Sequence, residues 1–216
     1  PYAAYVVPPM ADAVGVYHTN PQLVYVPHDP RLGEHLEDFG GMVCLYEERV
    51  AGDRSDMKSF GNTDKLESTI RVIDKIKKDH DYYIDQEAVV RARLFDIVIG
   101  DWDRHDDQWR WAEFDGKKGT TFYRPVPRDR DQAFFCSDGV LNWLVGRKWT
   151  QPKFQGFHEE IRYVEGLSFN ARWFDRTFMT ELELEDWLAY ADTIKINLTD
   201  EVIENAIKSW PEEIYN

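Results

Sequence analysis

The sequence predicts an α+β fold in which a β-containing portion comes first and a mostly helical region follows. The stretches 22–27 and 42–50 are rich in β-branched and aromatic residues, which is typical of strands. After residue 65, apolar residues recur mainly at helical spacing. One hairpin pattern interrupts the helices, because strand-like residues flank the turn sequence DGKKG at 115–119.

The amino-acid composition excludes several classes of protein and of binding partner. Of the 216 residues, 43% are hydrophobic and eight are tryptophan, which predicts a packed core and not a disordered chain. The net charge of −14 disfavours nucleic acid and anionic lipid as main partners. No apolar run is long enough to span a membrane, so we expect no transmembrane segment. Because the chain opens with PYAAYVVPPM and no methionine, we expect it to be covalently part of a longer polypeptide.

The elements of the first half follow from local signals. In residues 1–18, Pro8 and Pro9 predict a short helix, a break and another short element. Residues 22–27 and 42–50 are the predicted strands, and we expect the second to be buried. A TNP sequence at 19–21 predicts a turn. A helix then carries the apolar residues Leu66, Ile70, Ile73 and Ile76.

Capping residues and apolar stripes also predict the elements of the second half. Asp85 can N-cap a helix with Ala88, Ala92, Phe95 and Ile99 on one stripe. The hairpin follows, with Trp109 and Trp111 on one strand face, where we expect them to belong to the core along with Trp102. Near the end, Trp187, Leu188, Ala191 and Ile194 form another stripe, and Thr199 caps a last helix that Pro211 ends. We interpret Cys44 and Cys136 as two small buried apolar residues.

Two acid-rich segments flank the hairpin. The first is GDWDRHDDQWRW at 100–111, and the second is RDRDQAFF at 128–135. Since a hairpin returns to where it began, these segments should lie side by side. Converging carboxylates are costly unless a cation lies among them, and Mg²⁺ prefers such oxygen ligands and keeps some positions for phosphate. The alternative is a structural ion-pair network in which Arg104, Arg110, Arg128 and Arg130 neutralise the acids.

A helix, an acidic loop, a hairpin and a second acidic loop follow the order of a kinase C-lobe. In that order Asp103 would be the catalytic base, and Gln108, five residues later, would bind metal. Asp129 or Asp131 would hold the metal that bridges the phosphates, and the choice stays open. His105 could brace the loop by bonding a backbone carbonyl, or it could contact phosphate.

The motifs also resemble those of known families. GDWDRHDDQ is similar to the G-N-x-D-x-H-x-x-N loop of HipA-like kinases, the G-D-R-H-x-x-N loop of phosphoinositide lipid kinases and the D-R-H loops of secretory-pathway kinases. PRDRDQAF resembles the D-x-D-x-x-F segment of CotH-like spore-coat kinases, and MVCLYEERV resembles their strand leading to the hinge. The resemblance implies an atypical protein-kinase-like fold with Mg²⁺ (or Mn²⁺) and ATP as cofactors. It places Glu47 and Arg104 at the nucleotide, and it leaves the phosphate acceptor unknown.

The resemblance also implies an organisation. Residues 1–50 would form a partial N-lobe up to a hinge, and residues 51–216 a helical C-lobe. The stretch from YHTNPQLVYVP to DRDQAF further resembles an uncharacterised Bacteroidetes-type family that accompanies a metallophosphoesterase-like part and an outer-membrane part. A cell-envelope or periplasmic location would follow for the parent protein.

The sequence departs from the kinase pattern at three points. Gln108 replaces the usual Asn, no DFG stands intact, and neither a Gly-rich loop nor a strand Lys paired with a helix Glu is evident. A non-catalytic kinase-like module of a larger bacterial protein is therefore the alternative. A metal-dependent phosphohydrolase is a third hypothesis, which the scarcity of histidines near the motif disfavours.

Overall fold

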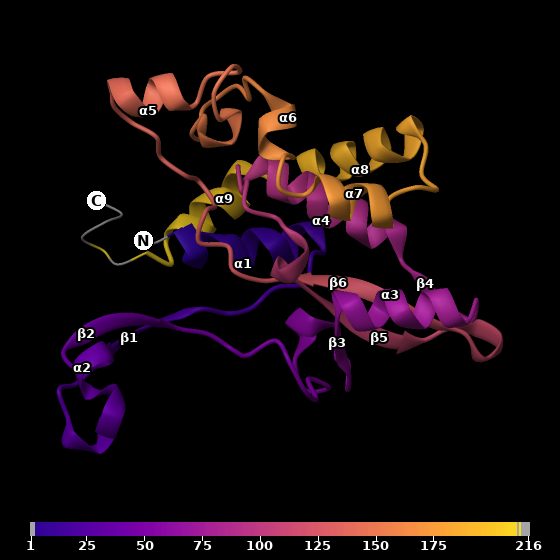
Figure 1. Ribbon diagram of the computed structural model, residues 1–216, viewed down its shortest axis with the longest axis horizontal. Helices are drawn as coiled ribbons and strands as arrows, with labels where there is room; N and C mark the ends of the chain where they lie inside the picture. The colour runs from indigo at the N-terminus through magenta and orange to yellow at the C-terminus, as the bar shows by residue number, and fades with distance from the viewer. Residues whose placement is uncertain (1–2, 211, 213–216) are drawn as a thin grey trace.

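The protein has an α+β fold with two small sheets, and the computed structural model describes residues 3–210 and 212. Figure 1 shows most helices on one side of the larger sheet, with a two-stranded ribbon projecting away from both. The strands are β1 Gln22–Val26, β2 Met42–Tyr46, β3 Leu66–Ser68, β4 Tyr82–Ile84, β5 Trp109–Asp115 and β6 Thr121–Pro127. The helices are α1 Ala3–Val14, α2 Leu36–Phe39, α3 Thr69–Lys78, α4 Gln86–Val98, α5 Val140–Val145, α6 Val164–Leu167, α7 Arg172–Phe178, α8 Leu184–Asn197 and α9 Asp200–Ile207.

The larger sheet has the strand order β3-β5-β6-β4. Its centre is the predicted hairpin, in which β5 and β6 pair antiparallel from Trp109 opposite Pro127 to Asp115 opposite Thr121. Both Trp109 and Trp111 are fully buried, so the prediction that they share the core face is confirmed. The strand β4, which pairs parallel to β6, was not predicted, because its three residues are too few to show a periodic pattern.

The N-terminal helix α1 continues through Pro8 and Pro9, so the expected break is wrong. A proline removes one backbone donor, and here only the carbonyls of the preceding turn lose a partner. The carbonyl of Tyr5 accepts instead from Oγ of Ser209 at 3.1 Å. Val6, Val7, Met10, Ala11 and Val14 are buried on this helix, and their packing outweighs the local cost of the prolines.

One hydrophobic core joins α1 to the helices and to the hairpin. Its buried members come from both ends of the chain: Val6, Val7, Met10, Phe95, Ile99, Trp109, Trp111, Tyr123, Phe174, Ile194 and Ala206 are among them. The core therefore crosses the division expected at residue 50. What projects from the body is the ribbon β1–β2 and not the whole of residues 1–50 (Figure 1).

The ribbon itself corrects two expectations. Strand β2 pairs with β1 alone and exposes Met42, Val43, Leu45 and Tyr46, so the prediction that it is buried is wrong. Cys44 on this strand is half-buried and Cys136 is exposed, so the two cysteines are not a buried pair of apolar residues. Apolar residues alone do not determine burial, because a strand is covered only where another layer packs on it.

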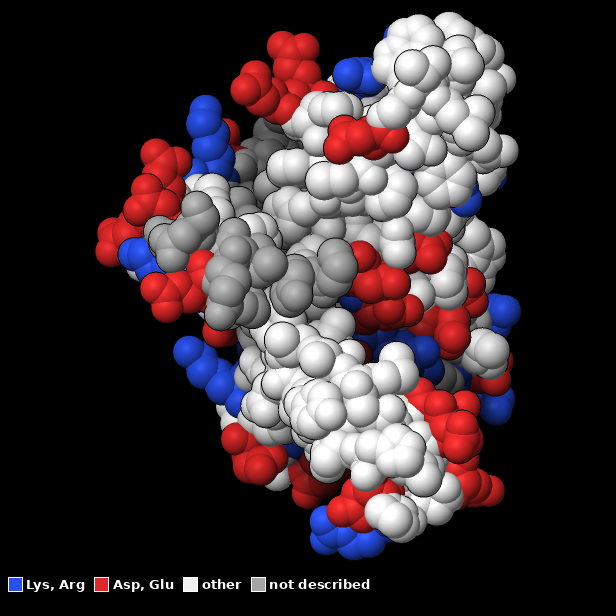
Figure 2. All heavy atoms as spheres, turned by 90° about the vertical axis from the view of Figure 1, so that its left-hand side faces the viewer, with Lys and Arg blue, Asp and Glu red and all other residues white. Residues whose placement is uncertain are grey.

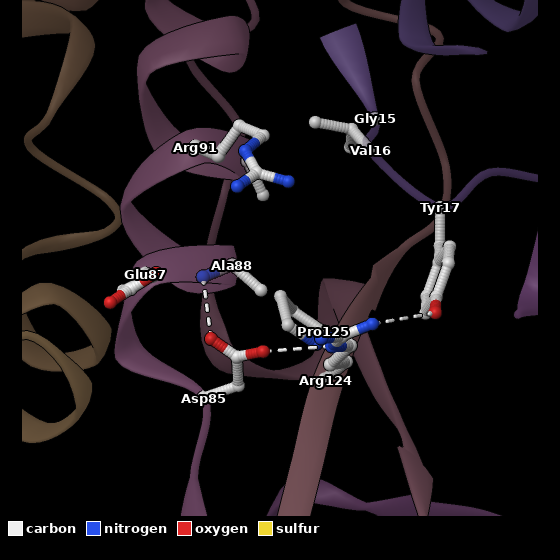
Figure 3. A pocket seen from close by; sticks show the side chains of 10 residues that line it. Gly15, Val16, Tyr17, Asp85, Glu87, Ala88, Arg91, Arg124 and Pro125 are labelled. Carbon is white, nitrogen blue, oxygen red and sulfur yellow. Dashed lines mark hydrogen bonds and ion pairs between the residues drawn. The ribbon is translucent and has the colours of Figure 1, made fainter. Parts of the chain in front are cut away.

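The predicted helix caps are confirmed. Oδ1 of Asp85 accepts from the backbone N–H of Ala88 at 3.0 Å and begins α4, while Oδ2 accepts from Nε of Arg124 at 2.7 Å. Figure 3 shows Asp85 between these two partners, with Arg124 extending towards Tyr17. Asp85 thereby joins the helix to β6. Thr199 caps α9 in the same way, through the N–H of Val202, and the expected stop at Pro211 lies outside the described residues.

Two helical stripes are only partly right. Leu66 belongs to β3, since α3 begins at Thr69, and Ile70 is exposed on that helix. In α8, Ile194 is buried whereas Leu188 is exposed. Within the described part of the chain, no helix combines the length and the apolar character that crossing a bilayer requires.

Candidate functional site

The acidic loops are positioned by the end of α4 and by the hairpin. The helix stops at Gly100, whose φ of +66° is a left-handed conformation that favours glycine and ends a helix. The 3₁₀ turn Asp106–Gln108 then leads into β5. The backbone N–H of Arg128 donates to the carbonyl of Gln108 at 3.1 Å, immediately beyond the last pair of the hairpin. The two acid-rich segments therefore lie side by side, as predicted.

The buried side chain of Arg104 forms hydrogen bonds with both loops. Its fully buried guanidinium donates to the backbone carbonyl of Arg128 at 2.7 Å and to that of Gln108 at 3.3 Å. Its Nε also donates to Oδ2 of Asp96 in α4 at 3.3 Å. All of these contacts are internal, and the side chain exposes no surface. The assignment of Arg104 to the nucleotide is therefore corrected: Arg104 fixes the shape of the loops.

A buried ion-pair network surrounds Arg104. Oδ2 of Asp96 accepts a hydrogen bond from Nη1 of Arg93 at 2.9 Å, and Oδ1 forms an ion pair with Nη1 of Arg130 at 2.7 Å. Burial alone would raise the pKa of Asp96, but the neighbouring guanidinium groups, Arg104 foremost, hold it below its ordinary value. Arg93 continues to Asp175 in α7 at 2.7 Å, so the network also anchors that helix.

Asp101 is the member of this network that is hardest to ionise. Burial, opposed by Arg104 and reinforced by the charge of Asp96, raises the pKa of Asp101 to about 6. Its Oδ2 lies 3.6 Å from Nη1 of Arg104 and 3.9 Å from Nη1 of Arg130. A carboxylate held here is closed off from solvent, so Asp101 supports the loop and is not available to a substrate.

The ion-pair alternative is thus partly realised, but with other acids than expected. Arg104 and Arg130 form ion pairs with Asp96 and Asp101. Arg110 and Arg128 both approach Asp107 at 3.5 Å. Within residues 3–210 and 212, none of these arginines forms an ion pair with the acidic members of the predicted site, which are Glu47, Asp103, Asp129 and Asp131.

These four residues form what we call the open acidic group. Desolvation and then the charges of Asp129 and Asp103 raise the pKa of Asp131. Desolvation also raises the pKa of Glu47, against its hydrogen bond from Thr19 and together with the charge of Asp129. Each carboxylate therefore experiences the charge of another member. Figure 2 shows acidic side chains gathered at mid-height on the face that it presents.

Neutral side chains orient members of this group. Nε2 of Gln108 donates to Oδ2 of Asp129 at 2.8 Å, and Asp129 has a left-handed φ of +57°. Nδ2 of Asn170 donates to Oδ1 of Asp103 at 2.6 Å. Oγ1 of Thr19 donates to Oε2 of Glu47 at 3.0 Å. These contacts hold three of the four carboxylates in place without neutralising them.

His105 is half-buried and directly precedes the 3₁₀ turn Asp106–Gln108. Its backbone carbonyl accepts from the N–H of Gln108 at 3.0 Å, which closes the 3₁₀ turn. No side-chain hydrogen bond is recorded for His105 among the described residues, so the bracing contact expected for it is not formed. A contact of His105 with phosphate stays a prediction.

Sequence reasoning missed the partners of the open acidic group. Asn170 lies 67 positions from Asp103, in a segment without a motif, and nothing in the sequence signals their contact. The TNP turn is more than a turn, since Asn20 donates through its backbone N–H and its Nδ2 to Glu48 at 2.7 and 3.0 Å, beside the Thr19–Glu47 contact. Consecutive polar residues at 19–20 and 47–48 were the one signal available.

The described residues contain no group of three or more His, Cys, Asp or Glu side chains arranged to hold a metal ion. The open acidic group is therefore a set of neighbouring charges and not one coordination shell. Comparisons with protein-family models, with curated proteins and with solved structures give no match to this chain.

Proposed function

We propose that this chain is a kinase-like phosphotransferase lobe that binds ATP with Mg²⁺ or Mn²⁺ and transfers phosphate to an acceptor that stays open. The observation that carries the proposal is the open acidic group: Glu47, Asp103, Asp129 and Asp131 influence one another. The ion pairs of the nearby arginines are with other acids, and among the described residues only the charge of Arg128 acts on a member of the group, Glu47. Neighbouring carboxylates are costly without a cation, and a divalent ion with a nucleotide would supply that charge.

The residues present fit such an ion. Mg²⁺ is usually bound by one or two carboxylates together with substrate phosphates, so three carboxylates in one shell are not required. Asp129 and Gln108 are already in contact, and they would hold the metal, with Asp131 as the alternative carboxylate. The Gln108 amide donates to Asp129 through nitrogen, so it would have to turn its oxygen towards the ion. When bound, the metal would neutralise charge on the phosphates.

The remaining roles follow from position. Asp103 would accept the proton of the attacking hydroxyl, and Asn170 would orient it. Glu47 would contact the nucleotide at the end of β2, held there by Thr19. Arg104, buried beneath the loops, would act only by keeping Gln108 and Asp129 at their present separation.

One observation favours the non-catalytic alternative. Kinases use a Lys–Glu ion pair at the nucleotide phosphates. Among the described residues, the Lys–Glu ion pairs are those of Lys65 and Lys75 with Glu67 and Glu113, which join β3, α3 and β5. Neither lysine forms a hydrogen bond or ion pair with the open acidic group in the described part of the chain, which favours a module without phosphate transfer.

Metal binding tests the proposal directly. Mn²⁺ would be titrated in the presence and absence of ATP into the parent chain and into a variant with Asp129→Asn and Asp131→Asn. The site variant should bind Mn²⁺ on the order of tenfold more weakly or worse. The control carries Asp106→Asn and Asp107→Asn, which remove the same charge from the neighbouring 3₁₀ turn. Equal weakening in both variants would show that the ion responds to overall charge, and the proposal would fail.

A further inference from the structure

One segment has a net charge opposite in sign to that of the rest of the chain. All 40 Asp and Glu residues lie outside residues 139–157, while Arg147, Lys148 and Lys153 lie within them. The segment therefore carries a formal charge of +3 in a chain of −14. The acids closest to it in sequence are Asp138 and Glu159. The overall charge that disfavours anionic surfaces does not describe this part of the molecule.

The segment is folded. Thr150 Oγ1 contacts the backbone carbonyls of Leu144, Val145 and Arg147 at 2.9, 2.5 and 3.0 Å, which closes the C-terminal end of α5. Gly146 lies so close to the 3₁₀ turn Pro152–Phe154 that a Cβ there would come within 2.7 Å of the carbonyl oxygen of Phe154. Figure 1 shows α5 at the top left, at the edge of the molecule and far from the larger sheet.

The outer surface of this segment is apolar. Val140 is 79% exposed, Leu141 73% and Trp149 76%, and no residue of α5 is buried. Trp143 and Leu144 are also exposed. Figure 2 shows a broad area without charged side chains at the top of the face, where α5 lies, with both basic and acidic side chains at its margin. An apolar surface of this kind on a protruding element marks a contact with another phase or molecule.

The cations lie among the apolar residues. The guanidinium carbon of Arg147 lies 3.6 Å from the ring centroid of Trp143, and Lys148 directly precedes Trp149. Exposed tryptophans and aliphatic residues next to Lys and Arg are typical of segments that lie in the interface of a bilayer, where the rings reach the headgroups and the cations reach lipid phosphates. Protein–protein interfaces are instead depleted in lysine.

We propose that residues 139–157 bind the surface of an anionic phospholipid bilayer. Val140, Leu141 and Trp149 would enter the headgroup region, and Arg147, Lys148 and Lys153 would contact lipid phosphates. The acids on the rest of the chain would be repelled by the same surface, so the protein would attach through this edge alone. The contact is peripheral, in keeping with the lack of a membrane-crossing helix among the described residues.

Vesicle sedimentation tests this binding. Vesicles of phosphatidylcholine alone and of an equal mixture of phosphatidylcholine and phosphatidylglycerol would be mixed with the chain and pelleted. We expect clear binding to the anionic vesicles and weaker binding to the neutral ones. A variant with Val140→Ser and Leu141→Ser should partition on the order of tenfold less. A variant with Arg147→Gln, Lys148→Gln and Lys153→Gln should bind anionic vesicles no better than neutral ones.

The control variant carries Ile70→Ser and Ile196→Ser. These isoleucines are 70% and 71% exposed on α3 and α8, so they match the test residues in exposure but lie in other helices. The control should bind like the parent chain. Absence of binding to both vesicle types would overturn the proposal, as would equal binding to both or equal loss in the two serine variants. A dimer in solution that Val140→Ser with Leu141→Ser dissociates would also overturn it, since a second copy would then cover this surface.

Discussion

The buried guanidinium of Arg104 donates a 2.7 Å hydrogen bond to the backbone carbonyl of Arg128, and so links the loop before the hairpin to the loop after it. Through this bond a residue without solvent exposure determines the separation of Gln108 and Asp129. Arg104 also lies over Trp109, with its guanidinium carbon 4.6 Å from the ring centroid. Arg104 therefore connects both loops to the hydrophobic core.

Replacing Arg104 with methionine tests this link. The change leaves Asp96 and Asp101 with fewer buried cations and two backbone carbonyls without their donor, so the free energy of unfolding should fall by about 3–5 kcal/mol. Urea denaturation monitored by tryptophan fluorescence measures it. Arg71→Met is the control, because Arg71 is itself 76% exposed and its partner Glu67, 3.5 Å away, keeps ion pairs with Lys65 and Lys75. A loss below about 1 kcal/mol for Arg104→Met would contradict the role assigned here.

The raised pKa of Asp101 gives stability a pH dependence. Its folded pKa of about 6 lies above the ordinary value of 3.8, so the folded state binds the proton more tightly than the unfolded state does. Protonated Asp101 carries no penalty below pH 4, and the penalty grows as pH rises to about 6, reaching roughly 3 kcal/mol. The raised pKa values of Glu47, Asp131 and Asp175 act in the same direction.

Asp101→Asn isolates the contribution of this one group. The variant keeps the shape of the side chain and cannot ionise, so its free energy of unfolding should fall less than that of the parent between pH 4 and pH 7. Denaturation at several pH values in this window gives the difference. Identical pH profiles for parent and variant would mean that Asp101 titrates near its ordinary value in the folded protein.

Replacing Trp109 with alanine tests how much this side chain contributes to the stability of the core. Its ring stacks on Phe174 with centroids 4.2 Å apart, and the side chain is fully buried. Trp109→Ala should therefore lower the free energy of unfolding by about 3–5 kcal/mol. Trp149→Ala removes a ring of the same size that is 76% exposed, and it should change stability by less than about 0.5 kcal/mol. Similar losses in the two variants would contradict the burial described here.

The sequence predicted those parts of the fold that local rules determine. The hairpin and the Asp85 cap depend on neighbouring residues, and the adjacency of the two acidic loops follows from the hairpin. Gln108 and Asp129, both expected as metal ligands, are in contact at 2.8 Å, and their binding of a metal stays a prediction.

The parts that were wrong depend on packing between distant segments. Arg104 was expected at the nucleotide, whereas it is buried against Asp96 of α4, eight residues earlier, and this burial depends on the three-dimensional packing. Asn170 reaches Asp103 from a segment that shows no motif. Helix α1 survives Pro8 and Pro9 because α9 packs on it and Ser209 replaces a lost donor. Patterns within a short window of sequence contain none of this information.

Asp101 and Asp103 lie two residues apart in the same loop, and the structure gives them different environments. Asp101 is buried with Arg104 and Arg130, whereas Asp103 is partly exposed and oriented by Asn170. Under the proposed function, Asp103→Asn should lower single-turnover phosphate transfer in the parent protein by on the order of 10²–10⁴-fold, because a positioned base contributes that much. Binding of Mn²⁺ should persist, since Asp103 is not an expected metal ligand.

Asn170→Ala should lower transfer less, and Asp101→Asn should act mainly through stability. Near-normal transfer by the Asp103→Asn protein would remove Asp103 as the base. A parent protein that binds Mn²⁺ and ATP without any transfer would establish the non-catalytic alternative.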